Sequence, residues 1–333
     1  MRRSYGRCAP GRRLRAGPAA EFADHSLVWD AGRVHPLLKY SLGTAAGAVA
    51  AGAACVTYAA AYEAHAFRLR RFDVPVLAPG SRPLRILHLS DLHLMPDQQD
   101  KVDWVRGLAA LEPDLVVNTG DNISDPESIP VALHAYERLL ELPGVFVFGS
   151  NDYYAPSPVN PFRYLRRKEG PRPLVAPKLP IEDLRRGFTE AGWLDLNNAK
   201  GELKADGRRW AFAGVDDPHI RVDRYSEVAG PADESAELTI GVTHAPYRRV
   251  LDAMTADGYR LLLAGHTHGG QLALPLYGAL VTNCDLDRGR AKGLSRWGLS
   301  WLHVSAGLGT SPYARIRFAC YPEASLLTLR PAR

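Results

Sequence analysis

Cysteine is scarce in this sequence, and its distribution indicates no cysteine-based site. The four cysteines lie far apart along the 333 residues and show no C-x-x-C spacing. Thiolate metal sites and disulfide-rich scaffolds both need cysteines at short, regular spacings. The sequence therefore favours neither class, and it also contains no internal repeat.

Most of the chain also lacks an excess of positive charge. The net charge of +5 arises within residues 1–40, where eight Lys or Arg residues stand against three acidic ones, so residues 41–333 are balanced. A nucleic-acid-binding domain is expected to carry a basic patch or stripe. No nucleic-acid partner is indicated, and the sequence does not define an oligomeric state.

A third absence is that of any charge in residues 41–62. As a helix this stretch would be about 33 Å long, enough to cross a hydrocarbon core of about 30 Å. The basic residues before it predict a single span with a cytoplasmic N-terminus and an extracytoplasmic main domain. Because the stretch is rich in Ala and Gly, a buried or interfacial helix and a cleaved segment remain alternatives. We predict a disordered basic arm over 1–40, a membrane helix over 41–62, a linker over 63–81 and one large domain over 82–333.

The large domain alternates short apolar runs with segments of helical periodicity, which predicts an α/β fold. Amphipathic helices are expected over 101–111, 129–142 and 246–256. Strands are expected over 84–90, 115–119, 145–148, 209–213, 237–243, 260–264, 301–305 and 325–329.

Aspartate and histidine recur where four of these predicted strands end. A single histidine is usually a core or surface residue, but strand ends are where open α/β sheets gather their ligands. Nitrogen and oxygen ligands suit Mn²⁺, Fe or Zn²⁺. Six ligands are too many for one tetrahedral site, so we predict two divalent ions that activate a bridging hydroxide for phosphate ester hydrolysis. The six candidates are Asp91, His93, Asp121, His244, His266 and His268.

The order of these motifs resembles that of the calcineurin-like metallophosphoesterases. Their signature blocks D-x-H, G-D-x-x-D/N, G-N-H-D/E, a single His and G-H-x-H match residues 91–93, 120–125, 149–152, 244 and 265–268. The tail at 305–329 is similar to the membrane-anchored bacterial subgroup. The resemblance implies two packed mixed β-sheets flanked by helices.

The same resemblance implies roles for single residues. Asp91, His93 and His268 would hold the first metal, and Asp121 would bridge the two ions. His244 and His266 would hold the second metal. Asp125 would support the ligands from behind them.

One block departs from the family pattern, because Gly149 is followed by Ser150, Asn151 and Asp152. The histidine that would protonate the leaving group is missing. In an ungapped alignment Ser150 stands at the position of the metal-binding Asn. With a shift of one residue, Asn151 supplies the amide ligand and Asp152 follows as a possible proton donor. We prefer the shift, because an amide oxygen ligates a hard divalent ion better than a hydroxyl.

Two further segments carry charge without a defined role. Residues 153–180 hold seven prolines and six basic residues, which is typical either of a solvated loop or of a cap that grips phosphate or anionic head groups. Asp216, Asp217 and His219 follow a predicted strand, and we expect them to form a turn and not a metal site.

These observations predict a membrane-anchored, metal-dependent phosphoesterase acting on a phosphodiester or pyrophosphate. The membrane span favours a lipid-linked substrate, although a phosphorylated small molecule is compatible with the same site. One alternative is a pyrophosphatase similar to UDP-2,3-diacylglucosamine hydrolase. Another is a metal-binding scaffold that lost catalysis together with its histidine.

Overall fold

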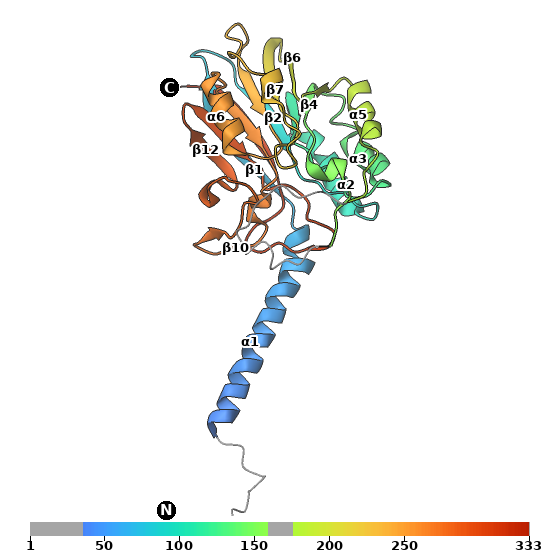
Figure 1. The fold of residues 1–333 in the computed structure, drawn as a ribbon, viewed down its shortest axis with the longest axis vertical. Coiled ribbons are helices and arrows are strands. Elements are labelled where there is room, and N and C mark those ends of the chain that lie inside the picture. Colours follow the sequence, from blue (N-terminus) through green and yellow to red (C-terminus); the bar gives the residue numbers. More distant parts are fainter. Residues whose placement is uncertain (1–35, 159–175, 333) are drawn as a thin grey trace, which may run out of the picture. The chain divides into compact units, whose positions relative to one another are not determined.

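The computed structural model describes residues 36–158 and 176–332, and in this part the chain forms two six-stranded sheets (Figure 1). The first sheet has the order β1-β14-β2-β3-β4-β5, with β14 antiparallel to β2 and the other neighbours parallel. Its strands are β1 (Arg68–Leu77), β2 (Leu84–Leu89), β3 (Leu115–Asn118), β4 (Gly144–Phe146), β5 (Leu194–Asp195) and β14 (Glu323–Pro331).

The second sheet has the order β12-β13-β9-β8-β7-β6, and its four inner strands are parallel. The outer strands β12 and β6 pair antiparallel with their neighbours. Its strands are β6 (Ala199–Ala205), β7 (Arg208–Gly214), β8 (Thr239–Val242), β9 (Leu261–Ala264), β12 (Gly293–Trp297) and β13 (Ser300–Val304). A separate hairpin joins β10 (Ala273–Leu274) to β11 (Gly278–Ala279).

The two sheets pack face to face around one apolar core. Ile86 and Val117 of the first sheet share this core with Ile240 and Leu263 of the second. Alternate residues of β2 point the other way, where Leu87 packs with the helical layer. Because both faces of the central strands are buried, their sequences read as nearly continuous apolar runs.

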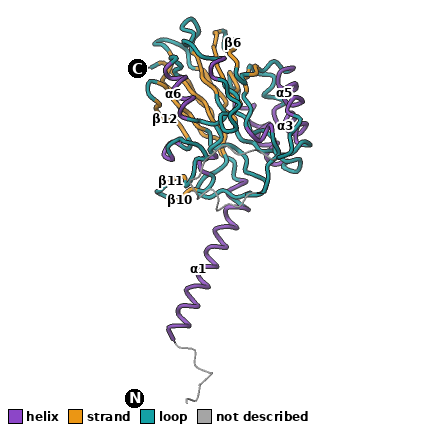
Figure 2. Tube along the Cα trace, viewed as in Figure 1, coloured by secondary structure: helices purple, strands orange, loops and turns teal. Residues whose placement is uncertain are grey.

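Helices cover the outer faces of the two sheets on opposite sides, as Figures 1 and 2 show. The first sheet is covered by α2 (Gln99–Gly107), α3 (Ser128–Tyr136) and α5 (Ile181–Glu190), and the second by α6 (Arg248–Ala256). The predicted α/β fold with two packed mixed sheets is confirmed. The short helices are α4 (Ser150–Tyr153), η1 (Glu63–His65), η2 (Leu108–Leu111), η4 (Tyr225–Glu227), η5 (His268–Gly270) and η6 (Arg288–Arg290).

The segment 63–81, which we expected to be a linker, contains the ten-residue strand β1. Strand β1 pairs in parallel with β14 from Arg68 onward. Its sequence RLRRFDVPVL hides this role, because an edge strand with one wet face carries charged residues that look like a tether. The folded domain therefore begins before residue 82.

Helix α1 (Pro36–Ala61) contains most of the uncharged stretch 41–62. Among the described residues, one helical segment, Thr44–His65, is long and apolar enough to cross a membrane by length and composition. Of the arm predicted over 1–40, residues 36–40 belong to α1, and the residues before 36 lie outside the described residues.

Candidate metal centre

The candidate ligands lie at the carboxyl ends of neighbouring parallel strands from both sheets. Asp91 and His93 follow β2, Asp121 follows β3, and the pair His266 and His268 follows β9. All five have positive φ angles, between 44° and 68°. Non-glycine residues rarely adopt this conformation, and such strain gathers at functional sites.

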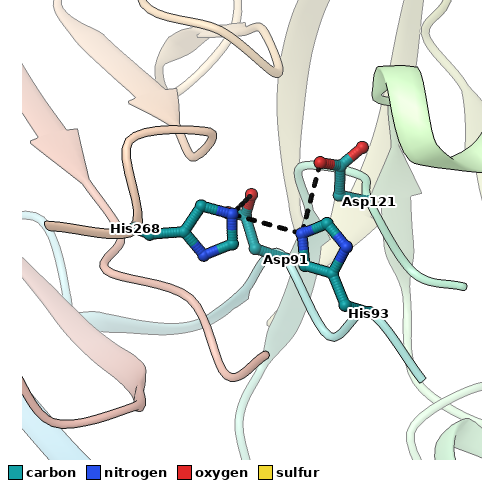
Figure 3. A group of neighbouring side chains, drawn as sticks. All are labelled: Asp91, His93, Asp121 and His268. Atoms are coloured by element: carbon teal, nitrogen blue, oxygen red, sulfur yellow. Dashed lines mark hydrogen bonds and ion pairs between the residues drawn. The ribbon is translucent and has the colours of Figure 1, made fainter. Parts of the chain in front are cut away.

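The first group contains Asp91, His93, Asp121 and His268, whose ligand atoms all lie within 4.8 Å of one another (Figure 3). The Nε2 atoms of His93 and His268 are 3.2 Å apart. Nε2 of His93 lies 3.4 Å from Oδ2 of Asp121, and Nε2 of His268 lies 3.5 Å from Oδ1 of Asp91. Two nitrogens and two carboxylates thus face one small space, which suits a divalent transition ion.

The second group contains His244 and His266 beside the same Asp121. Nε2 of His244 lies 3.3 Å from Nδ1 of His266 and 3.4 Å from Oδ2 of Asp121. The opposite nitrogens face backbone carbonyls, since Nδ1 of His244 donates to Thr119 at 2.7 Å and Nε2 of His266 donates to Asn283 at 3.2 Å. These outer bonds fix the ring orientations and leave the inner nitrogens available to a metal ion.

Protonation within the centre follows from burial and from Asp121. Burial lowers the pKa of His93 to about 4 and holds the pKa values of His266 and His268 well below the ordinary value. Neutral imidazole is the form that binds a metal. Burial also raises the pKa of Asp91 to about 6.

Asp121 and His244 shift in the opposite directions. Burial alone would raise the pKa of Asp121, but His244, His93 and the N–H of Asn151 together hold it well below its usual range. Burial would likewise lower the pKa of His244, yet the carboxylate of Asp121 raises it well above the ordinary value. A proton on His244 therefore neutralises Asp121, and a bound cation would take over that task and release the proton.

The altered block places Asn151, and not Ser150, against Asp121. The backbone N–H of Asn151 donates to Oδ1 of Asp121 at 2.8 Å, and its side-chain Nδ2 donates to Oδ2 at 2.8 Å. Gly149 allows this approach, because a Cβ there would lie 2.3 Å from Oδ1 of Asp121 and 2.6 Å from the ring of His244. The amide of Asn151 therefore lies beside the carboxylate that both groups share.

Asp152 is fully buried beneath the centre and faces the backbone. Its carboxylate accepts N–H bonds from Asp121 at 2.8 Å, from Asn122 at 2.7 Å and from Gly149 at 3.0 Å. Burial, followed by the charge of Asp121, raises the pKa of Asp152 to about 7. The carboxylate joins the loop after β3 to the loop after β4.

Asp125 lies in the segment between β3 and α3. Its carboxylate accepts the N–H of Glu127 at 2.9 Å, which closes the turn before α3. The neighbour of His93 in this segment is Ser124, whose hydroxyl lies 3.3 Å from Nδ1.

A chain of buried polar groups behind Asp91 escaped the sequence reasoning. Ser90 donates to Oδ2 of Asp91 at 2.5 Å, and Thr119 donates to Ser90 at 2.7 Å. Nε2 of His88 lies 3.0 Å from the Thr119 hydroxyl, and Nδ1 of His88 lies 2.9 Å from Nδ1 of His303. These directions require His88 to donate through Nε2 and His303 to donate through Nδ1. Every donor then points toward Asp91.

His303 comes from β13, so this series of hydrogen-bonded side chains crosses from the second sheet to the first. Its Nε2 is buried without a hydrogen-bond partner, as expected if that nitrogen carries no proton. The available signal was polar residues inside apolar strands, namely His88 in RILHLS and His303 in WLHVS.

Two further residues border the centre. The ring of His219 lies 4.4 Å from that of His266, centroid to centroid, and its Nδ1 is 3.1 Å from the hydroxyl of Tyr247. Asp217 is buried and accepts the N–H of His219 at 2.8 Å, which is the turn expected for this segment. The segment also reaches the second histidine group, which its sequence did not indicate.

The proline-rich basic loop 153–180 is described only at its two ends. Residues 159–175, with the arginines proposed to grip phosphate, lie outside the described residues. Tyr153 donates to the carboxylate of Asp216 at 2.8 Å and so links the start of the loop to the turn after β7.

Comparison with known proteins adds a family to this geometry. Residues 84–270 match the model of the calcineurin-like phosphoesterases. The phosphodiesterase YaeI of Escherichia coli (strain K12) is 26% identical over 270 residues, covering 79% of this chain and 88% of its own. The metallophosphoesterase YkuE of Bacillus subtilis (strain 168) is 26% identical over 297 residues, covering 86% and 93%.

A bovine transmembrane protein with a metallophosphoesterase domain is 29% identical over 212 residues, which cover 60% of this chain and 44% of that protein. Among solved structures, a 5'-nucleotidase precursor from Thermus thermophilus aligns with 74% of this chain and 55% of its own at 13% identity and a TM-score of 0.42.

Proposed function

This chain belongs to the calcineurin-like phosphoesterase family, and we propose that it hydrolyses a phosphodiester or pyrophosphate bond in a lipid-linked or nucleotide-linked substrate at a membrane. As a family member it is a metal-dependent phosphoric ester hydrolase. The bond that it cleaves and its location are our proposal.

The position of Asp121 between two histidine groups is the observation that carries this proposal. Its Oδ2 lies 3.4 Å from Nε2 of His93 on one side and 3.4 Å from Nε2 of His244 on the other. A single carboxylate oxygen in that position is suited to contact two ions. We assign Asp91, His93 and His268 to one ion and His244, His266 and Asn151 to the other.

Two divalent ions bound there would lower the pKa of a water and stabilise charge on the phosphoryl oxygens. The protein supplies their placement. The carbonyls of Thr119 and Asn283 orient the rings of His244 and His266, and Ser90 holds Asp91. Each such outer contact keeps a ligand atom aimed at the centre.

Proton transfer to the leaving group is the step in which this chain departs from its family. Both oxygens of Asp152 accept backbone N–H bonds, so we now assign Asp152 to loop ordering and not to proton donation. Without a dedicated acid, hydrolysis slows by about 10²- to 10⁴-fold only for poor leaving groups.

This assignment predicts a kinetic signature. The rate should fall steeply as the pKa of the leaving group rises, and Asp152→Asn should lower the melting temperature without changing that slope. Rates for a series of aryl phosphodiesters with both proteins measure the slope. A steeper slope in the variant would return the donor role to Asp152.

The membrane location is supported by α1 and by the transmembrane bovine relative. We propose that α1 spans the bilayer with the folded domain on the extracytoplasmic side. The full chain should then remain with membranes after a carbonate wash. Release by the wash would leave α1 as a peripheral helix.

A substrate panel tests the reaction. We expect the Mn²⁺-loaded protein to cleave phosphodiesters and nucleotide-sugar pyrophosphates faster than phosphomonoesters. Asp125→Asn serves as a matched control, because the carboxylate of Asp125 closes the turn before α3. No turnover of any ester by a protein that holds two metal equivalents would favour the scaffold alternative.

A further inference from the structure

The β10–β11 hairpin exposes apolar side chains that nothing in the described part of the chain covers. The exposed fractions are 37% for Leu272, 47% for Leu274, 109% for Leu276 and 60% for Tyr277. A cluster of exposed large apolar residues marks an interaction surface, whereas single ones need no explanation. Figure 2 shows the two short strands apart from the large sheets, among loops.

The tip of the hairpin holds Leu276 in an unfavourable backbone conformation. Tyr277 donates its N–H to the carbonyl of Leu274 at 3.1 Å, and Leu276 has φ of 68°. Residues 274–277 thus form a turn with Pro275 in the second position and Leu276 in the third. The third position of such a turn has a positive φ, and glycine or asparagine is preferred there. Leucine there is strained and fully solvated, so folding gains nothing from it.

The hairpin is fastened to the C-terminal end of α1 through residues 317–321. Ala273 donates to the carbonyl of Phe318 at 2.9 Å, and Phe318 donates to Gln271 at 3.1 Å. The ring of Phe318 lies 6.5 Å from that of Tyr58, edge to face. The N–H of Arg317 donates to the carbonyl of Ala59 at 3.2 Å.

This region combines apolar tips with aromatic and basic side chains. Arg288 lies over the ring of Tyr277 at 4.8 Å, and Arg68 lies over Tyr321 at 4.9 Å. The hydroxyl of Tyr321 is 3.1 Å from that of Tyr58. Tyrosines and arginines around exposed leucines are the composition of a surface that rests in the headgroup layer of a bilayer.

We propose that the β10–β11 hairpin is a second membrane contact, with Leu274, Leu276 and Tyr277 inserted into the headgroup and acyl boundary of the same bilayer that α1 spans. The inference rests on the proposed membrane location. Continuity with the end of α1 and the basic side chains favour an anionic lipid surface over a protein partner.

The contact has a consequence for the substrate. Only Gly269, Gly270 and Gln271 separate the ligand His268 from Leu272. A hairpin held in the bilayer would keep His268 near its surface. The enzyme would then act on phosphoesters of lipids that stay in the membrane.

Labelling at the hairpin tip tests the proposal on the full chain. In a background with Cys8→Ala and Cys55→Ala, Leu276→Cys receives an environment-sensitive fluorophore, and Leu299→Cys is the control. Leu299 is 80% exposed in the turn between β12 and β13. In phosphatidylcholine and phosphatidylglycerol vesicles, nitroxide lipids should quench the label at 276 at least about twofold more than at 299.

Equal, water-like emission at both positions would overturn the proposal. A shielded label at 276 that nitroxide lipids do not quench would indicate a second copy of the chain or another protein, and would overturn it too. Hydrolysis enters neither readout. If the protein resists the carbonate wash but shows no lipid contact at 276, only the proposed hairpin contact is refuted. Release by the wash refutes the proposed membrane span of α1.

A second variant separates membrane contact from folding. Leu276→Gly removes the strained side chain, so the melting temperature in detergent should stay equal or rise. A fluorophore attached at position 277 through Tyr277→Cys should nevertheless lose about half of its quenching by nitroxide lipids when Leu276→Gly is also present, because the leucine no longer inserts. Unchanged quenching would show that Leu276 does not insert into the bilayer, and would contradict its part in the proposed contact.

Discussion

The two sheets contribute different chemistry to one centre. The first carries the proposed oxygen ligands Asp91 and Asp121 and the amide of Asn151, with His93 as its one proposed imidazole ligand, while the second carries the imidazoles of His244, His266 and His268. Neither sheet alone offers a complete ligand set for either ion. The centre therefore depends on packing between sheets, and the shared apolar core holds the carboxylates against the imidazoles.

The difference extends to charge. Burial and a neighbouring imidazole act on Asp121 in opposite directions, and the imidazole of His244 from the second sheet prevails. Burial raises the pKa of Asp91 to about 6, although the Ser90 hydroxyl donates to its carboxylate. A buried carboxylate remains ionised where the opposite sheet places a positive partner beside it.

The largest test removes the residue that both groups share. Asp121→Asn should reduce hydrolysis by about 10³-fold or more. The substitution weakens the binding of both proposed ions and so removes several kcal/mol of transition-state stabilisation. Steady-state kinetics with a chromogenic diester measure the effect, and Asp125→Asn should stay near the parent rate. Turnover by Asp121→Asn close to that of the parent would end its bridging role.

Removing a ligand from the second sheet should affect one ion only. We expect His244→Asn to hold one metal equivalent where the parent holds two, because we assign His244 to the second ion, where its Nε2 lies 3.3 Å from Nδ1 of His266. Elemental analysis after Mn²⁺ reconstitution and gel filtration gives the count. Loss of both ions, or of neither, would contradict the division into two groups.

A smaller change tests which residue of the altered block supplies the amide. Asn151→Ala should weaken binding of the second ion about 10- to 100-fold, whereas Ser150→Ala should be nearly silent. Titration of the apoprotein with Mn²⁺ measures both affinities. The reverse order would restore the ungapped alignment, with Ser150 as the ligand.

The smallest expected effect concerns the polar chain that crosses between the sheets. Thr119→Val interrupts it and should cost about 1–2 kcal/mol of unfolding free energy and about 3- to 10-fold in metal affinity. Thr239→Val is the matched control, because its hydroxyl, at the start of β8 in the second sheet, donates to the carbonyl of Asp233 at 3.0 Å. Denaturant unfolding and Mn²⁺ titration separate the two effects. Equal metal affinities in both variants would show that these hydrogen-bonded side chains contribute to stability and not to metal binding.

The fold was predictable where strands are buried on both faces. Strands β2, β3 and β9 read as apolar runs that end in glycine or charged residues, so their positions followed from the sequence. Strands β1 and β12 did not, because edge strands carry charge and resemble linkers. The hairpin β10–β11 was also missed, since four paired residues give no periodicity to detect.

The sequence by itself determined which side chains can ligate and in which order they follow the strands, because D-x-H and G-H-x-H are local patterns at strand ends. Only the tertiary structure decided how they group. His93 and His268 meet across a separation of 175 residues, and Asp121 lies between two histidine groups. It also turned Asn151 toward Asp121 and Asp152 toward the backbone. The physical reason is that a local pattern fixes a residue at the end of a strand, whereas the packing of two sheets fixes which ligand atoms then come close to each other.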